Sequence, residues 1–324
     1  MGMEWYIVRR IAWAFIVTFI IVTITWGLLT AAPNPEVQRA VTQAAMDGED
    51  PAEAKDLAQK RLDMDRPLHV RFMDYVVGVY TLEWGWSNTR NQPVTDAIIS
   101  ALYYTVQYSV PWTVLTVLIG PVIGVYSAAN QYSWKDHAAT GFAFFGFAIP
   151  NFFFGIILLL IFGVQLGWIP IVYQTDVPVF SLENAIQLTM PVIVLVTGSV
   201  GAVMRVARNE AAEYANADFI KTAKAKGVSS YRIYARHVIR PTMVPLSTVI
   251  VFWILYLFTG ASLLVEVVFG IPGLGRTLYD ALIAQDTNLV LGSTLFFTFV
   301  ATIGNLIQDV VYTALDPRIS FEDR

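Results

Sequence analysis

Long stretches without a charged residue dominate the hydrophobicity pattern of this 324-residue chain. The first, residues 11–32, follows Arg9 and Arg10, and its 22 residues are close to the about 20 that a membrane-spanning helix needs. It is too long for the apolar core of a signal peptide, so we predict a retained first span with its N-terminus in the cytoplasm. Two further charge-free runs, 97–134 and 138–175, are each longer than one helix, and their prolines predict bent helices.

Three later apolar stretches complete the pattern, at residues 184–204, 241–265 and 287–308. Six crossings would place both termini on the same side of the membrane, and Lys and Arg are retained on the cytoplasmic side. The long segment 33–96 is left out of this count. With both termini inside, thirteen of the other basic residues are cytoplasmic and one, Arg276, is outside. We therefore predict an all-α integral membrane protein with six transmembrane helices and cytoplasmic N- and C-termini.

Residues 33–96 form the clearly aqueous segment, with eleven Asp and Glu against seven Lys and Arg. Residues 37–61 are rich in Ala and Glu and predict helix, whereas 84–88 and 91–93 predict turns. Long loops cross a membrane regardless of charge, so we expect this segment to be folded and extracytoplasmic. The predicted domains are the N-terminus and first span at 1–32, this segment at 33–96, a transmembrane core at 97–315 with a loop at 205–240, and a cytoplasmic tail at 316–324.

Composition agrees with a multi-pass protein of the cell membrane, because 56% of the residues are hydrophobic and 14% are charged. There is no cysteine, and the three histidines fall in separate segments, so no metal-ligand spacing exists. Gly273-Leu-Gly-Arg-Thr277 lacks the spacing of a phosphate-binding loop. The chain also has no cluster of titratable residues that would indicate a membrane enzyme. We expect no catalytic residue, cofactor or metal in this chain and no nucleic-acid partner, and any ATP-driven function must use another subunit.

Eight of the 21 Lys and Arg residues fall within 205–240, between the fourth and fifth predicted spans. Two short helices are predicted in this loop. Asn216 or Asp218 can cap the first, and Gly227 stands where a helix end needs a positive φ. A serine can cap the second, which we expect to end at Pro241.

The first of these helices presents Phe219 and Ala223 one turn apart on one face. A helix of about two turns needs a surface to dock against. Alternatively, the lysines of the loop could hold it at an anionic membrane face. Docking is the favoured interpretation, because a loop held at the membrane by its charge alone would need neither the glycine end nor the Phe219–Ala223 face.

Lys221-Thr-Ala-Lys-Ala-Lys-Gly227, followed by Arg236-His237 and Pro245, resembles the cytoplasmic loop of permease subunits of binding-protein-dependent ABC importers, in particular the dipeptide, oligopeptide and nickel branch. The family motif begins Glu-Ala-Ala, and this chain has Lys221, Thr222 and Ala223 at those places. Further runs that resemble this branch are Leu82-Glu-Trp-Gly-Trp-Ser87, Glu266-Val-Val-Phe-Gly-Ile-Pro-Gly-Leu-Gly-Arg276 and Leu315-Asp-Pro-Arg-Ile319.

The resemblance implies a permease subunit that imports peptides, although nickel and sugar importers belong to the same branch. It implies a second homologous permease, two ATPase subunits that use ATP and Mg, and an extracytoplasmic solute-binding protein as partners in the lipid bilayer. The loop would be the coupling helix that rests in a cleft of an ATPase subunit. The implied coupling residues are Asp218, Phe219, Lys221, Thr222, Ala223, Ala225, Gly227 and Arg232, and the candidates for an outer turn or gate are Glu266, Pro272, Gly273 and Gly275.

Glu266 lies at the predicted end of the fifth span, where water or an interfacial partner is within reach. A structural role as a polar anchor is therefore favoured over a role in transport. The alternative function for the whole chain is an ion-gradient-driven secondary transporter or channel. Such a protein would show buried charge in mid-span or inverted repeats with broken helices.

Overall fold

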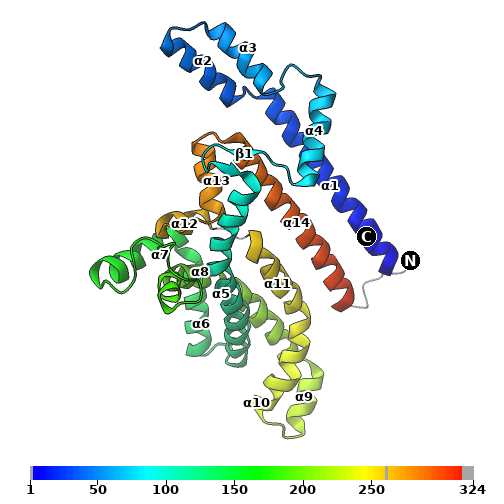
Figure 1. Ribbon diagram of the computed structural model, residues 1–324. Helices are drawn as coiled ribbons and strands as arrows, with labels where there is room; N and C mark the ends of the chain where they lie inside the picture. Colours follow the sequence, from blue (N-terminus) through cyan, green and yellow to red (C-terminus); the bar gives the residue numbers. More distant parts are fainter. Residues whose placement is uncertain (1–2, 260–261, 316–324) are drawn as a thin grey trace. The chain divides into compact units, whose positions relative to one another are not determined.

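A computed structural model describes residues 3–259 and 262–315 (Figure 1). Within those ranges the regular secondary structure is helical apart from one two-stranded hairpin. It divides into two compact units. The first contains the residues up to Ser100 together with Thr277–Leu306, and the second contains Ala101–Arg276 and the end of the last helix.

The first unit contains four helices and the hairpin before the long helix α5. Its elements are α1 (Met3–Ala31), α2 (Pro35–Asp47), α3 (Pro51–Arg61), α4 (Leu68–Thr81), β1 (Trp86–Ser87), β2 (Gln92–Pro93), the start of α5 (Val94–Ala129), most of α13 (Leu274–Ile283) and most of α14 (Thr287–Leu315). Val22 of α1, Val79 of α4 and Leu295 of α14 are buried together in its core. Most large apolar side chains of α1 are exposed, as expected of a helix that faces lipid.

The predicted helical stretch 37–61 is two helices, which lie side by side in Figure 1. Gly48 ends α2 with a φ of 75°, and Asp50 then caps α3, whose first residue is Pro51. Asn34 caps α2 by accepting hydrogen bonds from two backbone N–H groups. Helix α4 was not predicted, and the predicted turns are parts of the β1–β2 hairpin, in which Trp86 pairs with Pro93.

A buried carboxylate joins the hairpin to the start of α14. Asp286 is 2% exposed and accepts hydrogen bonds from the Ser87 hydroxyl (2.7 Å), the Thr89 N–H (2.9 Å) and the Leu289 N–H (3.2 Å). Burial alone would raise the pKa of Asp286, but these hydrogen bonds outweigh it and hold the pKa below its ordinary value. The carboxylate also stands at a helix N-terminus, where negative charge is favourable.

The second unit contains the rest of α5 and a set of shorter and longer helices. They are α6 (Trp134–Ala148), α7 (Asn151–Leu158), the π-helix η1 (Leu159–Gln165), α8 (Leu182–Ala215), α9 (Asp218–Ala225), α10 (Ser230–Arg232), the π-helix η2 (Ile233–Val238), α11 (Ile239–Thr259) and α12 (Leu263–Phe269). Its largest core cluster includes Tyr108 and Trp112 of α5, Val194 of α8 and Phe269 of α12.

Close helix packing in this unit depends on small residues. A Cβ atom on Gly124 would lie 2.5 Å from the Met204 carbonyl oxygen, so α5 and α8 approach at a distance that only glycine permits. Asp136, at the start of α6, accepts two hydrogen bonds of 2.8 Å from the Arg208 guanidinium of α8. It also accepts hydrogen bonds from the Ser127 hydroxyl and the Tyr132 N–H. This buried ion pair holds the start of α6 to α8.

Among the described residues, five helices are long and apolar enough to cross a membrane, and a sixth span exists if a bent pair is counted as one. The bent pair is α6 with α7 and η1, which meet at 97° beside Pro150 and correspond to the predicted third span. The predicted fifth span is interrupted, because α12 begins as a separate helix at Leu263. The predicted tail at 316–324 lies outside the described residues.

Candidate functional site

The basic loop contains α9, which is separated from the end of α8 by two residues. The predicted side-chain cap is wrong. Asn216 closes α8, while Ala217 precedes α9 without a side-chain hydrogen bond. Asp218 is instead the first residue of α9, where its carboxylate suits the helix dipole and pairs with the Lys221 ammonium at 2.7 Å.

Gly227 ends this helix with a φ of 74°, which confirms the predicted positive φ. Its N–H donates to the Lys224 carbonyl (3.0 Å), and the Val228 N–H donates to the Ala223 carbonyl (3.2 Å). This pair of bonds is a Schellman motif. Ala223 and Val228 both pack against one buried apolar cluster, which includes Ile220, and the motif favours such an apolar contact. The turn after α9 is therefore fixed by backbone geometry.

One face of α9 is docked against the same chain. Ile220 is fully buried in a cluster with Ala128 of α5, Ala211 of α8 and Ile233 of η2. The sequence analysis missed Ile220, although its spacing of three residues from Ala223 marks one helix face. Phe219, which the sequence predicts to face a docking partner, is 48% exposed, whereas Ala223 packs against this cluster. The short helix thus gains its support from neighbouring helices of its own chain.

The other face of α9 combines an exposed ring with positive charge. Beside Phe219, the exposed residues include Lys221, Thr222, Lys224, Ala225 and Lys226, and Arg232 of α10 is exposed as well. Asp218 is the single acidic residue in α9. An aromatic side chain among lysines, on a helix held rigidly from behind, suits contact with a protein partner that carries acidic groups.

The predicted second helix of the loop does not end at Pro241. The chain passes from α10 through η2 into α11 without a break, and Pro241 is the third residue of α11. The π-helix η2 ends three residues before Pro241, and such local changes of helix geometry accommodate the backbone hydrogen bond that proline removes. The second helix of the loop is therefore the beginning of a candidate membrane span, Ser230–Ile254.

The predicted outer turn is organised around Glu266 of α12, which is fully buried. Its carboxylate accepts hydrogen bonds from the Thr105 hydroxyl (3.0 Å), the Tyr108 hydroxyl (2.7 Å) and the Arg276 N–H (2.8 Å). The expected access to water is absent, because these donors take its place. A Cβ atom on Gly273 would overlap this carboxylate, so the turn needs glycine there.

Pro272 lies in the same turn, which runs from α12 to α13, and Gly275 is the second residue of α13. A Cβ atom on Gly275 would lie 2.9 Å from the Leu263 backbone. The structure thus places Glu266, Gly273 and Gly275 together, and the residues of α9 form a different cluster around Ile220. Thr105 and Tyr108 were missed because nothing in their local sequence marks them as partners of Glu266.

The fold and its apolar helices define a multi-pass membrane protein, and comparison with known proteins gives its family. Residues 120–321 match the family described as the binding-protein-dependent transport system inner membrane component, and residues 3–109 match the N-terminal region of the same kind of component. The chain belongs to this family of ABC importer permeases. ATP hydrolysis in such importers belongs to separate subunits.

Three relatives are similar along most of their length. The chain is 29% identical over 321 residues to the oligopeptide transport system permease protein AppB of Bacillus subtilis, covering 98% of this chain and 99% of the relative. It is 30% identical over 266 residues to the glutathione transport system permease protein GsiC of Salmonella typhimurium, covering 82% and 84%. A Brucella abortus protein named as a permease of a peptide transport system is 31% identical over 320 residues, covering 98% and 99%.

A solved structure shares the fold. A chain of the MetNI methionine ABC transporter, in an inward-facing conformation, superposes with a TM-score of 0.53 at 15% sequence identity. The match covers 68% of this chain and 96% of the MetNI chain.

Proposed function

We propose that this chain is one of two homologous permease subunits that enclose the pathway of an ATP-driven peptide importer. The observation that carries the proposal is the family match at 120–321, which contains a docked helix with an exposed aromatic and basic face. Relatives that match nearly the whole chain are named for oligopeptide and peptide transport. Peptides delivered by a solute-binding protein are therefore the proposed substrate.

The proposed topology has six spans with both termini in the cytoplasm, and it counts the bent pair of α6 with α7 and η1 as the third span. In this topology the loop with α9 is cytoplasmic, and thirteen basic residues lie inside. The segment that contains α2, α3 and α4 is extracytoplasmic, where a solute-binding protein would deliver substrate.

The proposed coupling element is α9. Its buried Ile220 and its Gly227 end make it a rigid projection, and its exposed face offers Phe219 and the lysines to an ATPase subunit. ATP and Mg would bind in two such subunits. Closure of the ATPases would shift α9, and the spans would follow between inward- and outward-facing states, because α9 contacts the two ATPase states differently.

The proposed role of the Glu266 turn is to keep α5 and α12 in register on the outer side of the pathway. The carboxylate holds two side chains of α5 and one backbone N–H beyond α12, so a gate at this turn would move as one piece. Gly273 and Gly275 allow the backbone to close around it.

Uptake by reconstituted vesicles tests the proposal. The full chain would be purified with the subunits that accompany it and placed in phospholipid vesicles with the binding protein and a labelled dipeptide. We expect accumulation that needs hydrolysable ATP and persists when ionophores collapse ion gradients. Uptake that follows the ion gradient without ATP would instead identify a secondary transporter. ATP-dependent uptake of Ni²⁺ but not of peptides would show that peptides are not the substrate.

A further inference from the structure

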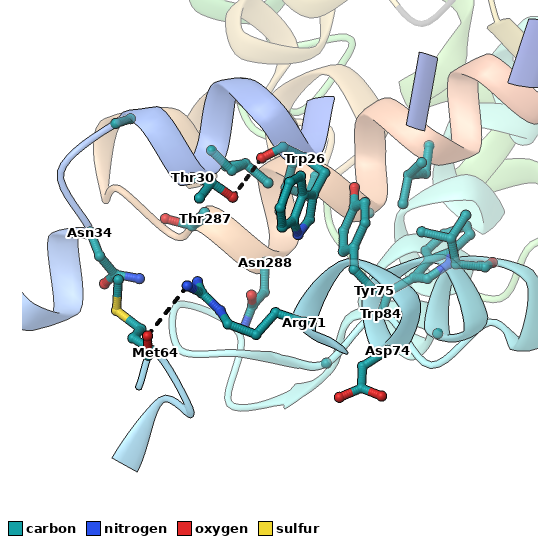
Figure 2. Close-up of a pocket in the computed structure, with 18 of the residues that line it drawn as sticks. Trp26, Thr30, Asn34, Met64, Arg71, Asp74, Tyr75, Trp84, Thr287 and Asn288 are labelled. Atoms are coloured by element: carbon teal, nitrogen blue, oxygen red, sulfur yellow. Dashed lines mark hydrogen bonds between the residues drawn. The ribbon is translucent and has the colours of Figure 1, made fainter. Parts of the chain in front are cut away.

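A cavity of about 450 Å³ lies within the first unit, at the C-terminal end of α1 (Figure 2). Residues of α1, α4 and the first turns of α14 line it. Its size falls in the roughly 300–1,000 Å³ range of sites that bind small molecules. Since α1 and α14 are candidate membrane spans, the cavity lies where two spans end together.

Arg71 of α4 reaches across this cavity, as Figure 2 shows. Its guanidinium makes one long hydrogen bond, 3.5 Å to the Met64 carbonyl, and has no other partner among the residues that the structure describes. A guanidinium carries five N–H donors, so most of them point at open space. By contrast, Arg66 pairs with Asp74 at 2.8 Å. Asp74 is directed away from the Arg71 guanidinium in Figure 2.

The remaining wall of the cavity is aromatic and apolar. Trp26, Tyr75 and Trp84 line it, and Val79 and Leu295, each 2% exposed, form its deepest part. The Tyr75 hydroxyl is buried and has no hydrogen-bond partner within the described ranges. Burial raises the pKa of Tyr75 to about 12, so this hydroxyl keeps its proton and can donate. The site therefore offers donors near an apolar surface.

We propose that this cavity binds the headgroup and upper acyl chain of a membrane phospholipid, with the phosphate on Arg71. The planar guanidinium matches the oxygens of a phosphate. The aromatic residues stand at the end of two spans, where Trp and Tyr favour the boundary between hydrocarbon and water. Trp26 and Leu29 of α1 contribute to the apolar wall, so an acyl chain attached to the phosphate would find an apolar surface on this helix.

Charge at the rim favours a zwitterionic headgroup. Glu83 lines the cavity and is exposed, with no ion pair among the described residues. A headgroup that carries an ammonium beyond its phosphate, such as phosphatidylethanolamine, would satisfy both Arg71 and Glu83. Phosphatidylglycerol has no such cation. A free dipeptide is also zwitterionic, but it offers no chain for the apolar wall that continues onto α1.

Quenching of tryptophan fluorescence tests this proposal, and it does not depend on the transported substrate. The full chain, purified in detergent with the subunits that accompany it, would be titrated with phosphatidylethanolamine brominated on its acyl chain. Bromine quenches tryptophans that it contacts, and Trp26→Phe identifies the part of the signal that comes from the cavity. We expect Arg71→Gln to weaken the binding at least tenfold, Arg71→Lys to weaken it less, and Arg66→Gln to leave it unchanged.

The other probes decide between sources of the anionic group. Brominated phosphatidylglycerol should bind more weakly than phosphatidylethanolamine, and Glu83→Gln should remove that preference. Inorganic phosphate and an unlabelled dipeptide should not displace the lipid at millimolar concentration. Displacement by the dipeptide, quenching that Trp26→Phe leaves unchanged, or equal loss in Arg71→Gln and Arg66→Gln would overturn the proposal. Thermal unfolding of each variant shows that it is folded.

Discussion

Two neighbouring residues of α9 allow folding and coupling to be separated by experiment. Ile220 is fully buried against α5, α8 and η2, whereas the neighbouring Phe219 is 48% exposed. Replacing a buried isoleucine by alanine costs about 2–5 kcal/mol. A helix of eight residues is not stable alone, so this loss falls on the docking of α9.

Hydrogen exchange measures that loss directly. At about 1.4 kcal/mol per factor of ten, Ile220→Ala should speed exchange of the α9 amides by about 30-fold or more. Phe219→Ala should leave their exchange close to that of the unmodified chain, because its ring makes less buried contact. Transport should fall in both variants, since one lacks a fixed α9 and the other lacks the exposed ring proposed to contact the ATPase.

Binding of the ATPase subunits then completes the test. Phe219→Ala should weaken their recovery with the permease, by about 1 kcal/mol or more if the ring is an interface anchor. Tyr231→Ala, at a residue that is 85% exposed in the same loop, is the matched control and should leave recovery unchanged. The reasoning is refuted if Phe219→Ala leaves both ATPase recovery and transport intact, or if Ile220→Ala leaves exchange of α9 unchanged.

Three further predictions follow from other residues. Gly227→Val should destabilise the end of α9 by about 1–2 kcal/mol, because a branched side chain is strained at positive φ, whereas Gly227→Asn should cost less; exchange at Val228 compares them. The lowered pKa of Asp286 gives stability that is complete above about pH 4 and lost as pH falls through the folded pKa. Thermal unfolding from pH 6 to 2 should therefore show an acid transition that Asp286→Asn reduces, and an equal transition in the variant would contradict it. Glu266→Gln should lower stability by about 1–3 kcal/mol by mismatching buried donors, with exposed Glu183→Gln as the control; equal melting temperatures would exclude this role.

The long apolar helices could be predicted from the sequence because charge-free length is a local property. The first span, predicted at 11–32, lies in α1 except for its last residue, and the sixth corresponds to α14. The bend predicted within 138–175 is confirmed by the 97° angle between α6 and the pair of α7 and η1, beside Pro150. The positive φ of Gly227 was also predictable, because it depends on the local backbone at the end of a helix and not on distant residues.

Partners distant in sequence could not be predicted in this way. Glu266 meets Thr105 and Tyr108, which are separated from it by 161 and 158 residues. The local sequence shows only that the Glu266 carboxylate lies near the end of a predicted span. Burying a carboxylate costs free energy unless it is hydrogen-bonded, and the sequence does not show which donors would bind it. The face of α9 that packs on its own chain could not be predicted for a related reason. Phe219 and Ile220 are both apolar neighbours, and only the surrounding helices decide which one points inward.

The ion pair between Asp136 and Arg208 has a mechanical consequence. The two parallel hydrogen bonds resist rotation as well as separation of the two side chains. The C-terminal part of α8 and the start of α6 are therefore expected to move together. Because two residues separate α9 from the end of α8 at Ala215, a force applied to the basic loop would reach this linked pair of helices close to the end of α8. A movement of α6 would then reach the 97° bend beside Pro150, which is far along the chain from the basic loop.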